Sequence, residues 1–310
     1  MLIKDPPVEI VDGLWMLGTN EYPLFLYNPA DRAVLFEGGV GAMGPLVLEQ
    51  MDKRGLAGNK VAQIVVTHAH PDHVMAVPLL RETFTGAKVL ASKTASRTLG
   101  SDKAVSFFCK IDGALTQALT KAGRITKAHH PKPLAEKRIA IDRTLKDGDT
   151  ISAGDGAAFT VLETPGHSEC SLSFHEPSRG ILLISDVSGY YMPEHKTWWP
   201  NYFTEYGTYL ESMMVLSELD AEVLCLSHNG VIKGAKDVAA YFADAIAATE
   251  AYHERIVAET KAGKDGRQLA EELGAEVYEK TQLLPLDFFQ KNCSILVKQS
   301  LIHEGMIEEQ

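Results

Sequence analysis

The sequence predicts an α/β protein: a large domain of alternating strands and helices, followed by a helical extension. Short apolar runs separated by turn residues recur through about the first 235 positions. Residues 92–130 carry helical spacing instead and interrupt this rhythm as a helical insertion. After Gly234 the strand pattern stops. We therefore expect one domain over residues 1–235 and a C-terminal extension over residues 236–310, packed on the same core.

The elements are expected in the following order. Apolar runs bounded by turn signals such as Asp12-Gly13 predict strands at 8–11, 14–17, 24–27, 33–36, 61–66, 138–142, 158–163, 171–175, 181–185 and, as the last one, 223–226. Apolar positions at helical spacing predict helices at 45–54, 73–82, 92–130, 206–217, 237–260 and 285–307. A further short helix is expected through Leu273, with Asp265 as its N-cap.

Composition narrows the class of protein. The chain has 310 residues, of which 45% are hydrophobic, and no stretch approaches the roughly 20 apolar residues that span a bilayer. The N-terminus lacks the apolar core of a secretory signal, and the four cysteines show no CxxC spacing. These features predict a cytoplasmic protein without a disulfide framework. The net charge of -11 disfavours a general nucleic-acid binder.

The charge is unevenly distributed. Residues 88–146 contain thirteen basic and four acidic residues, a local excess of nine positive charges. This basic segment suits either a docking surface for a phosphorylated ligand or a solvated helical face, and the sequence leaves both open.

Seven residues that can bind metal follow apolar runs. His68, His70, Asp72 and His73 stand in the heptapeptide THAHPDH, directly after the run at 61–66. His167, Asp186 and His228 each follow a later run, at 159–162, 181–185 and 223–227. Imidazole and carboxylate ligands suit zinc, iron or manganese, so the residue types do not choose among these ions.

This order of ligands resembles that of the metallo-β-lactamase superfamily. The resemblance implies a four-layer αββα sandwich and two divalent ions, zinc or iron, with manganese also suited. It assigns His68, His70 and His167 to the first ion and Asp72, His73 and His228 to the second, with Asp186 as the bridge. It further implies that a metal-bridging hydroxide attacks the substrate, and that Asp72 is either a ligand only or also orients that hydroxide. Ala69 stands where flavodiiron oxygen reductases have a carboxylate, which disfavours electron transfer.

A closer resemblance points to a glyoxalase II-like group that includes 2-aminobenzoylacetyl-CoA thioesterase. It rests on Phe36-Glu37-Gly38-Gly39-Val40, the helical insertion, the segments Asp186–Tyr190 and Thr197–Pro200, and the helical C-terminus. That thioesterase has a carboxylate where this chain has Tyr190, so the acyl group is not transferred. Tyr190 is instead a candidate hydrogen-bond donor to a leaving group or oxyanion. The aromatic run that follows suits either a substrate pocket or ordinary packing; its candidate substrate-binding residues are Tyr191, His195, Trp198 and Trp199.

The leading hypothesis is therefore a dinuclear metallohydrolase that cleaves an acyl- or aroyl-CoA thioester. A lactonase or other carboxylic-ester hydrolase with Tyr190 as donor is one alternative. A regulatory binding protein with a vestigial metal site is another, which the complete ligand set disfavours. The expected partner is a small-molecule thioester or ester, with no nucleic acid and no membrane, and the C-terminal helices suggest a homodimer.

Overall fold

The computed structural model describes residues 1–29 and 31–308, in which the chain forms two compact units. Unit 1 contains residues 1–163, 170–185 and 220–235. Unit 2 contains residues 164–169, 186–219 and 236–310. The C-terminal helices thus share a unit with two earlier segments. The expected division at residue 235, and the packing of residues 236–310 on the same core, stay predictions.

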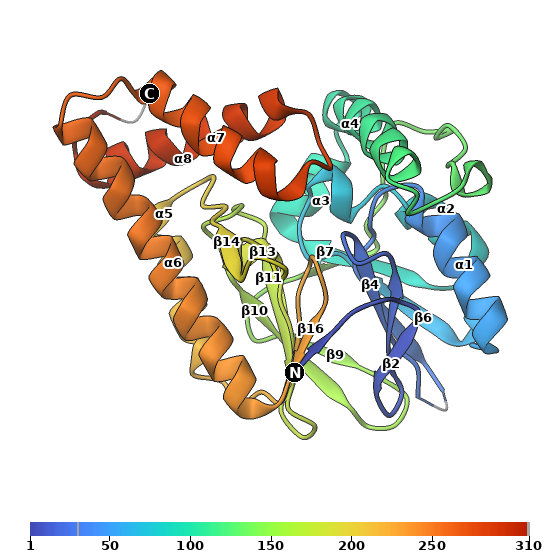
Figure 1. Ribbon diagram of the computed structural model, residues 1–310. Helices are drawn as coiled ribbons and strands as arrows, with labels where there is room; N and C mark the ends of the chain where they lie inside the picture. Colours follow the sequence, from blue (N-terminus) through green and yellow to red (C-terminus); the bar gives the residue numbers. More distant parts are fainter. Residues whose placement is uncertain (30, 309–310) are drawn as a thin grey trace. The chain divides into compact units, whose positions relative to one another are not determined.

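Unit 1 holds two seven-stranded sheets (Figure 1). The first has the order β2-β3-β4-β5-β6-β7-β8, and its strands are Val8–Val11, Leu14–Gly18, Pro23–Tyr27, Ala33–Phe36, Val61–Val65, Lys88–Ser92 and Arg143–Leu145. The second has the order β1-β16-β15-β12-β11-β10-β9, and its strands are Leu2–Ile3, Val231–Lys233, Val223–Cys225, Ile181–Leu183, Leu172–Glu176, Ala158–Glu163 and Thr150–Ser152. Antiparallel neighbours dominate, but β5 to β8 pair in parallel because helices connect them.

The core of unit 1 joins inward-facing side chains of both sheets. Phe159 of β10 has no exposed surface and contacts Tyr27 and Phe36, with ring centroids 5.3 and 4.9 Å apart. Phe36 also reaches Phe174 of β11 at 5.2 Å. These aromatic contacts fix the carboxyl end of β5, which leads into the metal-binding loops.

The helices of unit 1 are α1 (Met43–Arg54), α2 (Val77–Thr83), α3 (Lys93–Leu99) and α4 (Asp102–Lys121). The side chains of Ser92 and Ser101 cap α3 and α4 by accepting from the backbone N–H of Ala95 and Ala104. The predicted helical insertion is therefore confirmed and consists of two capped helices. Figure 1 shows α4 in green beside the shorter α3.

Unit 2 consists of a short hairpin and four helices. The hairpin strands β13 (Tyr190–Met192) and β14 (Thr197–Trp199) precede α5 (Tyr206–Ser217), α6 (Ala235–Lys261), α7 (Gly266–Thr281) and α8 (Leu286–His303). Asp265 caps α7 as predicted, accepting from two backbone N–H groups. The helices α7 and α8 pack closely at Gly274, because this residue has no side chain; a Cβ there would lie only 2.6 Å from the Gln290 backbone. None of the described helices has the length and apolar character needed to cross a membrane.

Four predictions of local structure are wrong. Residues 138–142 form no strand, because Ile139 N–H bonds to the Leu99 carbonyl and Arg138 pairs with Asp102 before β8 begins. The last strand is β16, not 223–226. The helix expected at 73–82 starts at Val77, after a 3₁₀ turn over Pro71–His73. The helical stretch expected over 92–130 ends at Lys121, where α4 ends. In addition, the aromatic run after Asp186 contains a β-hairpin for which no strands were predicted.

Candidate metal centre

The heptapeptide THAHPDH begins where β6 ends. Val61–Val65 is almost fully buried, and Pro71 fixes the start of the 3₁₀ turn that contains Asp72 and His73. His68 is fully buried, and its Nε2 lies 3.1 Å from Nδ1 of His70. The two imidazoles therefore aim nitrogen atoms at one point, as ligands of a single ion would.

The second group in unit 1 brings Asp72, His73 and His228 together. One ligand atom from each residue lies within 4.8 Å of the other two. Asp72 Oδ2 is 3.5 Å from His73 Nε2 and 3.8 Å from His228 Nε2. His228 follows β15 and is placed by a tight turn, in which Asn229 has a φ of 65°. These three residues, which the resemblance assigns to one ion, thus lie together within unit 1, and their role as ligands stays a prediction.

Hydrogen bonds on the Nδ1 atoms fix the orientation of the imidazole rings. Nδ1 of His228 donates to the Glu21 carbonyl at 2.6 Å. Nδ1 of His73 lies 3.0 Å from Glu37 Oε2, and Nδ1 of His68 lies 3.2 Å from the Thr67 hydroxyl. A proton held on Nδ1 leaves Nε2 as the atom with a lone pair, which is the usual arrangement around metal-binding histidines.

Glu37 supports two of these histidines at once. Its Oε1 accepts a 2.7 Å bond from the Thr67 hydroxyl, whose oxygen can accept from His68, while Oε2 accepts directly from His73. Glu37 is 2% exposed and has a φ of 75°, a strained value for a residue with a side chain. Strain and a buried carboxylate both cost stability, so their presence beside the motif points to a functional requirement.

The loop after Glu37 is hydrogen-bonded to the segment that contains the heptapeptide THAHPDH. Gly38 N–H donates to the His73 carbonyl, and Met75 N–H donates to the Gly39 carbonyl, both at 2.9 Å. A Cβ on Gly38 would lie 2.6 Å from the His73 carbonyl oxygen, so only glycine allows this approach. The loop and the motif therefore hold each other in place.

Asp112 of α4 anchors the far end of this loop. It is 6% exposed, and its Oδ1 accepts a 2.6 Å bond from Gly41 N–H. Burial raises the pKa of this carboxyl to about 6, with a further contribution from the negative charge of Asp72.

Unit 2 carries the remaining two candidate ligands. His167 Nε2 lies 3.5 Å from Asp186 Oδ2, and both residues are buried. His167 Nδ1 donates to the Asn201 carbonyl at 2.8 Å, the same pattern as in unit 1. Gly166, at a φ of 114°, lets the loop pass against the Tyr209 backbone, where a Cβ would come within 2.3 Å.

The aromatic candidates lie in the hairpin. Tyr191 pairs with Trp198 across the strands, their ring centroids are 4.6 Å apart, and both contact Tyr241 of α6. Trp199 is buried and contacts Phe289 of α8 at 5.4 Å. These contacts show packing within unit 2, so the substrate-binding role of the rings stays a prediction.

Two further candidates lie in the same hairpin. Tyr190 is partly buried and pairs with Trp199, while His195 occupies the exposed turn. Their proposed roles in catalysis and substrate binding stay predictions.

Sequence reasoning missed the groups that orient the ligands. Glu37 was noted only as part of a resemblance, and Thr67, Glu21 and Asn201 were not considered. A carboxylate directly after the buried strand at 33–36 and before Gly-Gly was a usable signal for Glu37. The carbonyls of Glu21 and Asn201 carry no such signal, because every residue has one.

The donor set fits divalent metal ions. Within unit 1, His68 lies beside His70, and Asp72 lies with His73 and His228; within unit 2, His167 lies beside Asp186. Imidazoles with anchored Nδ1 atoms and carboxylates beside them are the chemistry of zinc and iron sites.

The chain is similar in sequence to known proteins. Over 130 residues the chain is 31% identical to YobT of Bacillus subtilis, which covers 42% of this chain and 47% of YobT. Over 141 residues it is 27% identical to a hydroxyacylglutathione hydrolase of Rhizobium etli, which covers 46% of this chain and 38% of that enzyme. The chain thus spans less than half the length of these curated relatives.

A solved structure shares the fold. The metallo-β-lactamase family protein TTHA1429 of Thermus thermophilus aligns with a TM-score of 0.62 at 20% identity, over 96% of this chain and 95% of its own. The sequence profile of the metallo-β-lactamase superfamily matches residues 24–228, more than half of the chain. The protein is therefore a member of the metallo-β-lactamase superfamily.

Proposed function

We propose that this protein is a dinuclear metal-dependent hydrolase that cleaves thioesters, with an acyl- or aroyl-CoA as its substrate. The observation that carries the metal-dependent part is the anchoring of four histidines through Nδ1, which prepares four Nε2 atoms beside two carboxylates. Metal-binding histidines usually donate their other ring N–H in this way, which keeps the ring oriented.

The seven candidate ligands divide between two ions in this proposal. His68, His70 and His167 would hold the first, Asp72, His73 and His228 would hold the second, and Asp186 would contribute to both. Two divalent ions, when bound, lower the pKa of a coordinated water and polarise the carbonyl under attack. Zinc and iron both suit the donors, and manganese is the third candidate.

The chain's own residues contribute orientation. Glu37 and the Glu21 and Asn201 carbonyls fix the rings, so little reorganisation is needed during the reaction. Asp72 has a partly exposed carboxylate 3.5 Å from His73, which suits a ligand that also orients a nucleophilic water. A thiolate is a good leaving group, so the proposal requires no strong general acid, and Tyr190 acts as a hydrogen-bond donor.

The relatives support the reaction class. The hydroxyacylglutathione hydrolase of Rhizobium etli is named for cleaving an acyl thioester of glutathione. The choice of CoA over glutathione rests on the basic segment 88–146, because CoA carries phosphates and glutathione does not. A cytoplasmic location and a homodimer stay predictions.

The decisive experiment is thiol release from thioesters of CoA, glutathione and N-acetylcysteamine, with bound metal quantified in the same preparation. We expect two ions per chain and metal-dependent turnover. Asp186→Ala should lower turnover at least roughly a hundredfold and reduce the metal content. Asp287→Ala, which removes an exposed carboxylate at the start of α8, should change neither. Two bound ions with no thiol release from any thioester would refute the proposal and favour lactones, esters or phosphodiesters.

A further inference from the structure

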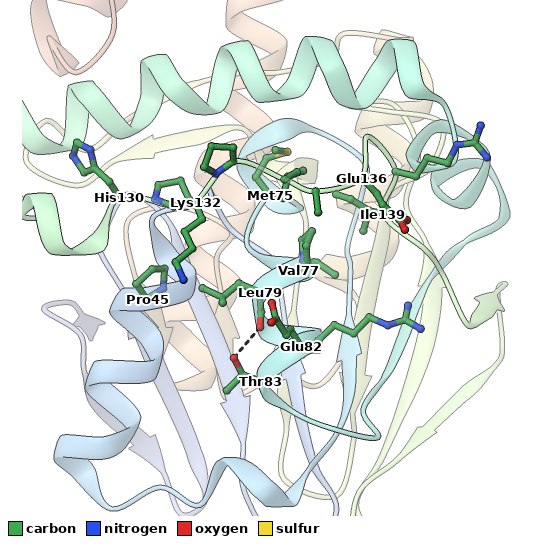
Figure 2. Close-up of a pocket in the computed structure, with 18 of the residues that line it drawn as sticks. Pro45, Met75, Val77, Leu79, Glu82, Thr83, His130, Lys132, Glu136 and Ile139 are labelled. Carbon is green, nitrogen blue, oxygen red and sulfur yellow. Dashed lines mark hydrogen bonds between the residues drawn. The ribbon is translucent and has the colours of Figure 1, made fainter.

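Unit 1 contains a large cavity that the metal site does not use. Its volume is about 1000 Å³, at the upper end of the range typical of small-molecule sites. It lies between α2 and the segment 128–140 (Figure 2). The walls are mostly apolar, and include Pro45 of α1, Val77 and Leu79 of α2, and Ile139.

The segment over the cavity, residues 131–138, is a strap tied at its ends. On one side, His129 Nε2 lies 3.0 Å from Glu49. On the other, Ile139 N–H bonds to the Leu99 carbonyl at 3.0 Å. Between these points the strap makes no backbone hydrogen bond to any part of the chain that the structure describes, and Pro131 and Pro133 have no N–H to offer. The strap can therefore adjust to an occupant without losing backbone hydrogen bonds.

Charge is distributed unequally along the cavity. Figure 2 shows the Lys132 side chain running from the strap toward Pro45 and Leu79 at one end. Lys132 has no ion-pair partner within residues 1–29 and 31–308. At the other end, Arg81 is bonded to Asp142 and the Ala140 carbonyl.

Other ionised side chains line the cavity too. Arg138 is paired with Asp102, while Glu82 and Glu136 bring negative charge to the wall. Figure 2 places Glu136 with Ile139, away from Lys132. The end with Lys132 is thus the one that suits an anion, and the excess of nine positive charges over residues 88–146 adds a favourable field.

We propose that this cavity binds the phosphorylated adenosine of coenzyme A, with Lys132 as the countercharge of a phosphate. The proposal rests on the proposed function, since it takes the substrate to be a CoA thioester. Apolar proline and leucine side chains offer faces for the adenine ring, and the lysine at one end offers three N–H donors to a phosphate. Glutathione has neither group, so the cavity selects between the two thiol carriers.

The first test is direct binding, which does not depend on catalysis. Adenosine 3′,5′-bisphosphate is titrated calorimetrically into the full-length protein at low and moderate salt. We expect saturable binding that Lys132→Ala weakens roughly tenfold, because one charge-assisted contact is lost. Lys121→Ala is the matched control: it removes a charge from the same basic segment outside the cavity, and should change affinity less than about twofold. Absence of binding, or an equal loss in both variants, would overturn the proposal.

The second test separates this inference from the proposed function. KM is measured for one acyl group carried by CoA and by N-acetylcysteamine, which lacks the nucleotide. Lys132→Ala should raise KM for the CoA thioester roughly tenfold and leave both kcat values and the KM of the short thioester unchanged. If both substrates are turned over and Lys132→Ala changes neither KM, the thioesterase proposal is supported and the nucleotide site is refuted. If the bisphosphate binds but no thioester is turned over, the nucleotide site is supported and the thioesterase proposal is refuted.

Discussion

The substitution Glu37→Gln tests the most specific feature of the metal centre. Glu37 accepts from His73 with one oxygen and from Thr67 with the other, and Thr67 in turn contacts His68. An amide has one accepting and one donating end. With its NH₂ group toward His73, the amide forces the His73 proton from Nδ1 to Nε2. With its NH₂ group toward Thr67, it removes the acceptor of the Thr67 hydroxyl, which then favours donation to His68 Nδ1 and a proton on His68 Nε2. A proton on Nε2 blocks the atom that is expected to bind metal.

The expected loss can be bounded. Partners that orient metal-binding histidines contribute roughly 10- to 100-fold to metal affinity, or about 1.4 to 2.7 kcal/mol. The metal-free protein should lose less, under about 1 kcal/mol, because the amide still forms two hydrogen bonds in the altered tautomer. The signature is therefore a large change in metal affinity with a small change in the free energy of unfolding of the apoprotein.

Competition with a chelator of known affinity measures the first quantity, and urea unfolding of the apoprotein measures the second. Glu49→Gln is the control, since Glu49 also pairs with a histidine, His129, at 3.0 Å, but lies outside the motif. It should leave metal affinity within about twofold. Equal metal affinity in wild type and Glu37→Gln would refute the argument that the Nδ1 partners prepare the ligands.

Three further predictions concern stability, each measured by urea unfolding of the metal-free protein. The pKa of the Asp112 carboxyl is about 6 in the folded state, against an ordinary value of 3.8. Between these two pH values the folded state therefore binds a proton more tightly than the unfolded state does. The free energy of unfolding should therefore fall by at most about 3 kcal/mol as pH rises from about 4 to 7. Asp112→Asn should lessen that fall, and the same pH dependence in wild type and variant would contradict the prediction. Phe159→Ala should lower the free energy of unfolding by about 3 to 5 kcal/mol, because the ring is fully buried between the sheets. A change near zero would mean that the core repacks to fill the cavity. Asp265→Ala should cost about 1 kcal/mol by removing the cap of α7, whereas Asp265→Asn should cost less.

Sequence patterns predicted the long elements well. The α/β class, the capped helices between 93 and 121, and the positions of α5 and α6 are confirmed, because each is defined by spacing over many residues. The convergence of Asp72, His73 and His228 was also predictable. Asp72 and His73 lie in the segment that follows the buried strand β6, and His228 lies in the segment that follows the buried strand β15.

The short elements were beyond sequence reasoning. Strands β1 and β16 have two and three residues, too few to show a period of two. The hairpin β13–β14 contains aromatic residues that suit a pocket wall and a strand equally. The hydrogen bonds that orient His228 and His167 are accepted by backbone carbonyls. Because every residue has a carbonyl, the residue types do not show which one will accept.

The pairing of β1 with β16 has a consequence for the order of folding. Met1 donates to the carbonyl of Lys233, 232 positions later, and Leu2 and Ile3 supply the edge strand that covers β16. Leu2 and Ile3 can therefore form their strand only after β16 has been synthesised, more than 200 positions later. Without β1, strand β16 is an unpaired sheet edge beside the turn that carries His228, and unpaired edges of this kind promote association with other chains. A variant that lacks Leu2 and Ile3 should therefore aggregate more readily than the wild type.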